Sequence, residues 1–99
     1  MIRTFKNHDN GDSFQFDFRR KRLSGRYVIY CLSHPSSPFP LGHPAHLLAG
    51  DEVCIKAGQE PYDLERAKAI ALVWMRGFSH YIRTGIFPNG PTRVNVGES

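Results

Sequence analysis

The chain has 99 residues, a length typical of one domain with one hydrophobic core. Hydrophobic residues make up 40% and charged residues 22% of the chain, a composition that excludes an intrinsically disordered protein. No stretch approaches the roughly 20 apolar residues of a membrane span, and residues 1–6 contain no signal-peptide core. We therefore expect a single cytoplasmic domain over residues 1–99, with a polar tail from about residue 92.

The first half of the chain has the pattern of an antiparallel sheet. Aromatic and polar residues alternate strictly over residues 13–19, which predicts a half-buried strand with its phenylalanines on one face. Turn residues separate this segment from a short strand at residues 2–6 and from a β-branched and aromatic strand at residues 26–32. Three consecutive strands with short turns predict a meander, and residues 52–55 are either a short fourth strand or an extended piece.

The second half contains the element with the strongest pattern, a helix predicted from Leu64 to about Thr84. Asp63 is the expected N-cap, and Gly85 supplies the C-terminal stop. Gly77, inside the helix, indicates a bend or a close packing contact. One apolar stripe comprises Leu64, Ala67, Ala71, Trp74, Phe78 and Tyr81.

Between these halves, residues 33–50 contain four prolines and no regular period. Proline fixes φ and removes a hydrogen-bond donor, so an ordered irregular segment is predicted. Such long irregular segments in small domains usually carry function. The fold class expected is therefore α+β: an antiparallel meander of three to four strands, a proline-rich irregular segment, and one long C-terminal helix packed on the sheet.

The candidate catalytic residues are Cys54, His43 and His46, all in or beside the irregular segment. A nucleophilic thiol needs access to solvent and a route to the thiolate, and either histidine is a candidate proton-transfer partner. The alternative is that Cys54 is a small core residue, as is expected for Cys31 within its hydrophobic strand. Two cysteines are too few for the disulfide framework of a secreted domain, so both are expected to be thiols.

We expect neither a metal nor a cofactor. His43, His46 and Cys54 lack the fourth ligand of a structural zinc site, and a His-x-x-His with one distant cysteine is a weak pattern. The sequence has no glycine-rich phosphate loop.

The net charge of +4 raises the question of an acidic partner. The basic residues concentrate in one run, at a predicted strand end: Arg19, Arg20, Lys21 and Arg22. This run is either the solvated end of a strand or a contact surface for nucleic acid or an acidic protein.

The order of several short motifs resembles the ubiquitin-conjugating enzyme family. That family has a meander, a proline-rich descent, a His-Pro-Asn motif, a nearby glycine, the thioester cysteine and a helix. The corresponding residues here are Pro38-Phe39-Pro40, His43-Pro44-Ala45, Gly50, Val53-Cys54-Ile55 and the helix opening at Pro61. The helix end, Trp74 to Gly85, is similar to that of bacterial members, so the resemblance is to a short, divergent, bacterial-type member and covers roughly residues 26–90.

The resemblance implies a cysteine-dependent transferase. Cys54 would accept a ubiquitin-like modifier from an activating enzyme as a thioester and pass it to an amine, while His43 and Pro44 would shape the adjacent loop. Ala45 stands where the family has the asparagine that assists aminolysis, and the family's N-terminal helix has no room before the first strand. The expectation is therefore either an active carrier or an inactive, partner-binding relative.

Overall fold

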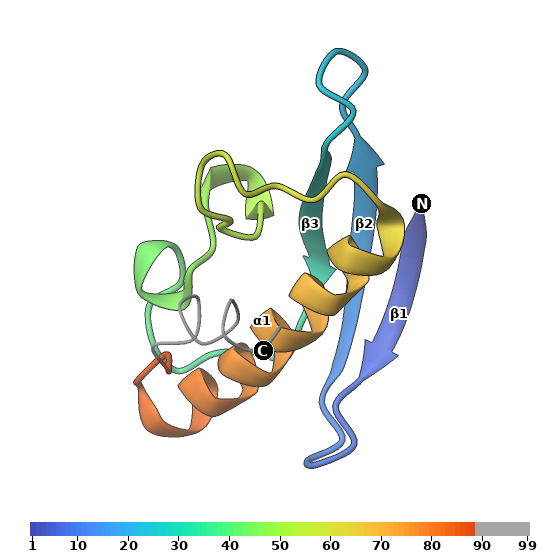
Figure 1. The fold of residues 1–99 in the computed structure, drawn as a ribbon. Coiled ribbons are helices and arrows are strands. Elements are labelled where there is room, and N and C mark those ends of the chain that lie inside the picture. The colour runs from blue at the N-terminus through green and yellow to red at the C-terminus, as the bar shows by residue number, and fades with distance from the viewer. Residues whose placement is uncertain (89–99) are drawn as a thin grey trace.

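A computed structural model describes residues 1–88 and confirms the α+β class. Its strands are β1 (Ile2–Lys6), β2 (Ser13–Arg20) and β3 (Tyr27–Ser33), which form an antiparallel sheet in the order β1-β2-β3. The 21-residue helix α1 (Leu64–Thr84) crosses one face of this sheet (Figure 1). The bounds of the helix agree with those predicted from the sequence.

The alternating pattern of β2 separates its two faces as predicted, with one exception. Phe14, Phe16 and Phe18 are at most 2% exposed and face the helix. Asp17, on the opposite face, is also buried. Its carboxylate is not left unpaired there, because the Arg19 guanidinium donates to it at 2.6 Å. This hydrogen bond is the main reason that the pKa of Asp17 lies below its ordinary value.

Both ends of α1 have the expected caps. The Asp63 carboxylate accepts a hydrogen bond from the Arg66 backbone N–H at 2.8 Å. Gly85 ends the helix at φ 81°, a left-handed conformation that favours glycine, and its N–H donates to the Tyr81 carbonyl at 2.7 Å. These caps explain why the helix begins and ends where the sequence indicated.

An aromatic cluster joins the helix to the sheet. The Phe78 ring lies 4.9 Å from that of Trp74 and 5.9 Å from that of Phe14, and Trp74 also lies 5.9 Å from Phe16. Phe78 and Phe16 have no measurable exposure. The predicted apolar stripe of α1 is therefore core, with Leu64 half-buried at its start.

The segment between β3 and α1 is irregular, as predicted, apart from two short 3-10 turns, η1 (His43–Ala45) and η2 (Ala49–Asp51). Residues 52–55 do not form a fourth strand. They make two isolated antiparallel bridges instead, Glu52 with Tyr30 and Val53 with Leu47. Each bridge has a different partner segment, so the two cannot extend into one ladder.

From the sequence we expect no membrane-spanning segment, and the long helix α1 is the element on which this expectation can be checked. Within residues 1–88, α1 does not combine the length and apolarity that crossing a bilayer requires. The predicted polar tail from about residue 92 lies outside the described residues.

Candidate functional site

The proline-rich segment is attached to α1 through its backbone carbonyls. The Trp74 indole Nε1 donates to the carbonyls of Ala45 and His46, at 3.1 Å in each case. About two turns further along the helix, the Tyr81 hydroxyl donates to the Pro40 carbonyl at 2.5 Å. Because buried carbonyls need partners, these two aromatic side chains determine where the segment lies on the helix.

Cys54 follows directly from this attached segment. Its backbone N–H donates to the His46 carbonyl at 3.0 Å, so the cysteine lies beside the turn that contains the histidines. The residue is half-buried, whereas its neighbour Val53 is buried. The alternative of a fully enclosed Cys54 is therefore wrong, and a partly exposed cysteine is compatible with the access that a nucleophile needs.

Cys31 has the opposite surroundings, as predicted. It is 1% exposed in the core, and burial raises the pKa of its thiol to about 12. A group with that pKa is almost wholly protonated at neutral pH, so Cys31 is unsuited to nucleophilic chemistry.

His46 is the histidine that the fold holds most closely. It occupies the left-handed region at φ 53°, which is uncommon for a residue other than glycine. Its ring lies 4.4 Å from that of Phe87, and burial, followed by the charge of His43, lowers the pKa of its imidazole. His46 is therefore a neutral imidazole at pH 7, which is able to accept a proton.

Phe87 reaches His46 because α1 leaves room for it. A Cβ atom at Gly77 would lie 2.6 Å from Phe87 Cζ, closer than packed atoms can approach. The glycine predicted to mark a close contact therefore does so, and the contact leads to the candidate site.

His43 contributes less to the site than His46. It is exposed at the start of η1, where its carbonyl accepts the His46 N–H at 2.9 Å. Among the hydrogen bonds of residues 1–88, none joins the Cys54 thiol to either imidazole. The structure thus brings Cys54 and His46 together through the backbone, without a preformed thiol–imidazole pair.

The part of the chain that the structure describes has no cluster of three or more His, Cys, Asp or Glu residues able to hold a metal ion. The set of His43, His46 and Cys54 considered from the sequence does not form such a cluster.

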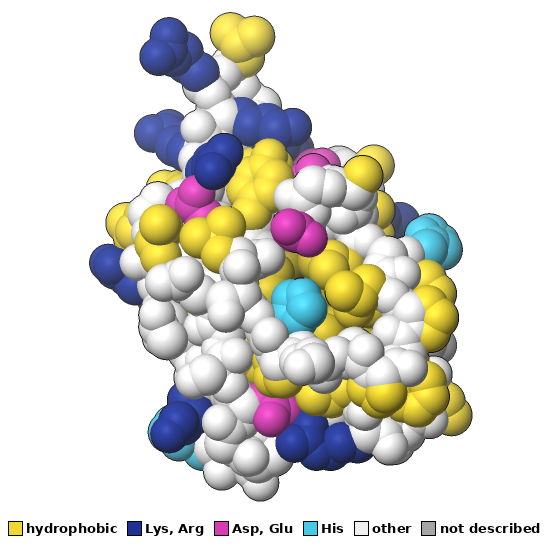
Figure 2. Space-filling model, turned by 180° about the vertical axis from the view of Figure 1, so that it is seen from behind, with side chains coloured by type: hydrophobic (Ala, Val, Ile, Leu, Met, Phe, Trp, Pro, Cys, Tyr) yellow, Lys and Arg dark blue, Asp and Glu magenta, His cyan; other side chains and the backbone are white. Residues whose placement is uncertain are grey.

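The basic run lies on a hairpin that projects from the body of the molecule between β2 and β3 (Figure 1). Figure 2 shows Lys and Arg side chains on this projection and a hydrophobic side chain at its tip. Leu23 is 100% exposed there, and Lys21 and Arg22 are also exposed. Part of the run has structural contacts: Arg20 Nε lies 3.4 Å from the Gly25 carbonyl.

Arg19 is also engaged, because its guanidinium lies 4.7 Å above the Tyr30 ring in addition to its ion pair with Asp17. Lys6 does not extend this basic surface, because it lies at the other end of the sheet, opposite Ser13. All four cations of the run are exposed, but Arg19 and Arg20 already contact other groups of the described chain, which leaves Lys21 and Arg22 as the better candidates to contact a partner.

Sequence reasoning missed the two aromatic side chains that shape the site, the Trp74 indole and the Phe87 ring. Helical spacing predicts that Trp74 belongs to the core, and this prediction is correct. The spacing does not predict where the Nε1 N–H of the indole finds its acceptor. A buried indole N–H needs an acceptor, and the only signal was the excess of carbonyls over donors in a proline-rich segment.

Comparison of the chain with protein-family models, with curated proteins and with solved structures returns no significant match.

Proposed function

We propose that this protein is a ubiquitin-conjugating-like carrier, with Cys54 as the residue that holds a ubiquitin-like modifier as a thioester. The observation that carries the proposal is the contrast between the partly exposed Cys54, beside a neutral imidazole, and the enclosed Cys31. The resemblance in motif order gives the same residue the same role.

The loading step is a transthioesterification. The Cys54 thiolate attacks the carbonyl carbon of the modifier's C-terminal thioester on an activating enzyme. The new C–S bond forms as the old one breaks, and the activating enzyme's cysteine leaves as a thiolate. We assign to His46, whose pKa is lowered by burial, the role of base for the Cys54 proton.

The discharge step transfers the modifier to an amine. The amine nitrogen attacks the thioester carbonyl, the Cys54 thiolate leaves, and the nitrogen loses a proton. Ala45, which replaces the family's asparagine, is buried with its carbonyl bound to Trp74. Its methyl side chain cannot donate to a developing oxyanion, so we propose that loading is faster than discharge in this protein.

The test uses an acetylated peptide ending in Gly-Gly as its benzyl thioester, which replaces the loaded activating enzyme. We expect one acyl adduct on Cys54, detected by intact mass and removed by hydroxylamine. The Cys31→Ala variant should retain the adduct, and Cys54→Ala should lose it. Equal labelling of both thiols, or no adduct at all, would reject the proposal.

The role of His46 is tested in the same assay. His46→Gln should slow acylation by about a hundredfold near pH 7, the lower end of the range for a general base. His80→Gln is the matched control, because His80 is exposed on α1. The effect of His46→Gln should shrink at high pH, where solvent already deprotonates the thiol.

A second candidate is a binding module for nucleic acid or an acidic protein. The observation in its favour is the projecting hairpin, on which Lys21, Arg22 and the fully exposed Leu23 lie together. A hairpin that projects from the body of the molecule can enter a groove of a partner without any rearrangement of the hydrophobic core.

Binding of a fluorescent DNA duplex tests this candidate. Reversal of both charges, Lys21→Glu with Arg22→Glu, should reduce affinity, and affinity should fall with added salt because bound cations release counterions from the duplex. Arg66→Glu with Lys68→Glu, on α1, is the charge-matched control. Binding that ignores salt, or falls equally in the control, would reject the hairpin as a nucleic-acid surface.

A further inference from the structure

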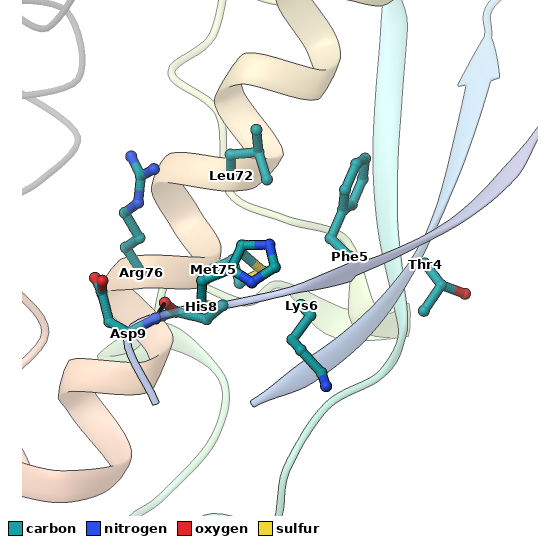
Figure 3. A pocket seen from close by; sticks show the side chains of 9 residues that line it. Thr4, Phe5, Lys6, His8, Asp9, Leu72, Met75 and Arg76 are labelled. Carbon is teal, nitrogen blue, oxygen red and sulfur yellow. Dashed lines mark hydrogen bonds between the residues drawn. The ribbon is translucent and has the colours of Figure 1, made fainter. Parts of the chain in front are cut away.

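A cavity of about 420 Å³ lies between the outer edge of β1 and α1, away from both candidate sites above. Phe5 contributes the strand side of its apolar floor, and Leu72 and Met75 contribute the helix side. Figure 3 shows the Phe5 side chain between the strand and the helix, whereas those of Thr4 and Lys6 point away from the helix. The cavity is large enough for one or two side chains of a ligand.

The edge of β1 beside this cavity has free backbone groups. β1 has one neighbour in the sheet, β2. The Phe18 N–H donates to the Met1 carbonyl and the Asn7 N–H to the Asp12 carbonyl, so the odd-numbered residues of β1 face β2. Alternate residues of an antiparallel strand point their N–H and C=O in opposite directions.

The backbone groups of Thr4 and Lys6 therefore point outward, along the rim of the cavity. Another extended chain can pair with such a row of groups, which is the mode of recognition in which a peptide adds a strand to a sheet edge. The side chains of an added strand alternate in direction, so one of them would enter the cavity above Phe5.

The charges around the cavity select the ligand. Arg76 lines its helix side, whereas Lys6 lies on β1 with its side chain pointing away from the helix, where alternate side chains of an added strand would lie. Neither takes part in an ion pair within residues 1–88. His8 and a single carboxylate, Asp9, lie at one end. The excess of unpaired cations matches an acidic ligand, in line with the net charge of +4.

A second copy of this chain fits the edge less well. Residues 2–6 contain Arg3 and Lys6 and no acidic residue, so pairing of two copies along β1 would gather four cations on one short ladder. Cations on an edge strand oppose such self-association. An acidic peptide from another protein relieves that repulsion.

We propose that the edge of β1 and the adjacent cavity bind an acidic peptide in extended conformation. The peptide adds a strand to β1 and inserts one apolar side chain over Phe5, Leu72 and Met75. This inference does not depend on the chemistry of Cys54.

The test begins with selection from a phage-displayed library of random nine-residue peptides on the full chain. Selected peptides should carry Asp or Glu on both sides of one apolar residue. For the synthetic peptides, Lys6→Glu and Arg76→Glu should each weaken binding by about tenfold, and Arg22→Glu, the same charge change on the distant hairpin, should leave it unchanged. Melting curves verify that each variant is folded.

A second measurement separates strand addition from attraction of charge alone. N-methylation of alternate amides of a selected peptide should abolish binding for one set of alternate positions and leave it for the other, because only one set faces β1. Equal effects of both sets, an equal loss in Arg22→Glu, selection of no common pattern, or sedimentation as a dimer paired through β1 would each overturn the proposal.

Discussion

The two cysteines lie in two regions that differ in how their positions are determined. Cys31 belongs to β3, in a core closed by Phe16 and the aromatic side chains of α1. Cys54 belongs to the irregular segment, whose carbonyls are bound to Trp74 and Tyr81. The first region is stabilised by burial of apolar surface, and the second by a few specific hydrogen bonds. Chemistry is suited to the second region, because a few hydrogen bonds leave side chains partly accessible.

The largest expected difference between the regions is in thiol reactivity. Raising the pKa of Cys31 from 9.0 to about 12 leaves it about a thousandfold less thiolate than an ordinary cysteine at the same pH. Alkylation by iodoacetamide at pH 7.5, followed by mass spectrometry of the digested protein, should therefore label Cys54 while Cys31 stays essentially unlabelled in the folded protein. Comparable rates would remove the contrast between the two regions, and the proposed role of Cys54 with it.

The next effect concerns stability, which we expect to depend mainly on the core between sheet and helix. Phe78→Ala would leave a cavity among Phe14, Trp74 and Tyr81 and should lower the free energy of unfolding by about 3–5 kcal/mol. Urea unfolding followed by circular dichroism measures this change. Leu48→Ala, in the irregular segment and 40% exposed, is the control and should change it by less than about 1 kcal/mol.

A smaller effect is expected where the two regions meet. Trp74→Phe keeps most of the ring but removes the Nε1 donor to the carbonyls of Ala45 and His46, and should destabilise the protein by about 1–2 kcal/mol. Hydrogen exchange should show faster exchange of the Cys54 amide, which depends on the His46 carbonyl, with that of Val28, paired with Arg19 in the β2–β3 ladder, as the internal control. An unchanged Cys54 amide would mean that the segment is held by its own turns.

The smallest effect is a pH dependence from His46. Its pKa is lowered in the folded state, so the unfolded chain binds more protons between the lowered value and the ordinary one near 6.5. The stability associated with a neutral His46 is therefore complete above about pH 6.5 and is lost progressively as the pH falls.

Replacement of His46 by glutamine should flatten this part of the profile. Thermal unfolding between pH 5 and 7, on the wild type and the His46→Gln variant, provides the measurement. His80→Gln is the matched control, because His80 is exposed on α1 and is not among the groups that shift the pKa of His46. Parallel profiles for the wild type and His46→Gln would show that the imidazole is hydrated in solution.

The elements were predictable because local chemistry specifies them. Strict alternation over residues 13–19 led to β2, and a cap at each end with an apolar stripe between them led to α1. The fourth strand was a wrong extension of the same reasoning. Residues 52–55 have a suitable composition, but the backbone groups of the neighbouring segments allow only isolated bridges.

The sequence by itself determined the fold class, the helix bounds, the strand bounds to within one residue and the cysteine that belongs to the core. These depend on periodicity and on residues close along the chain. Only the tertiary structure decided that Cys54 is partly exposed beside His46, that Trp74 holds the loop between them, and that the edge of β1 opens onto a cavity. These features join residues that are distant in sequence. From the sequence, the Trp74 indole N–H has many carbonyls as possible acceptors, and only the packing of the chain selects those of Ala45 and His46.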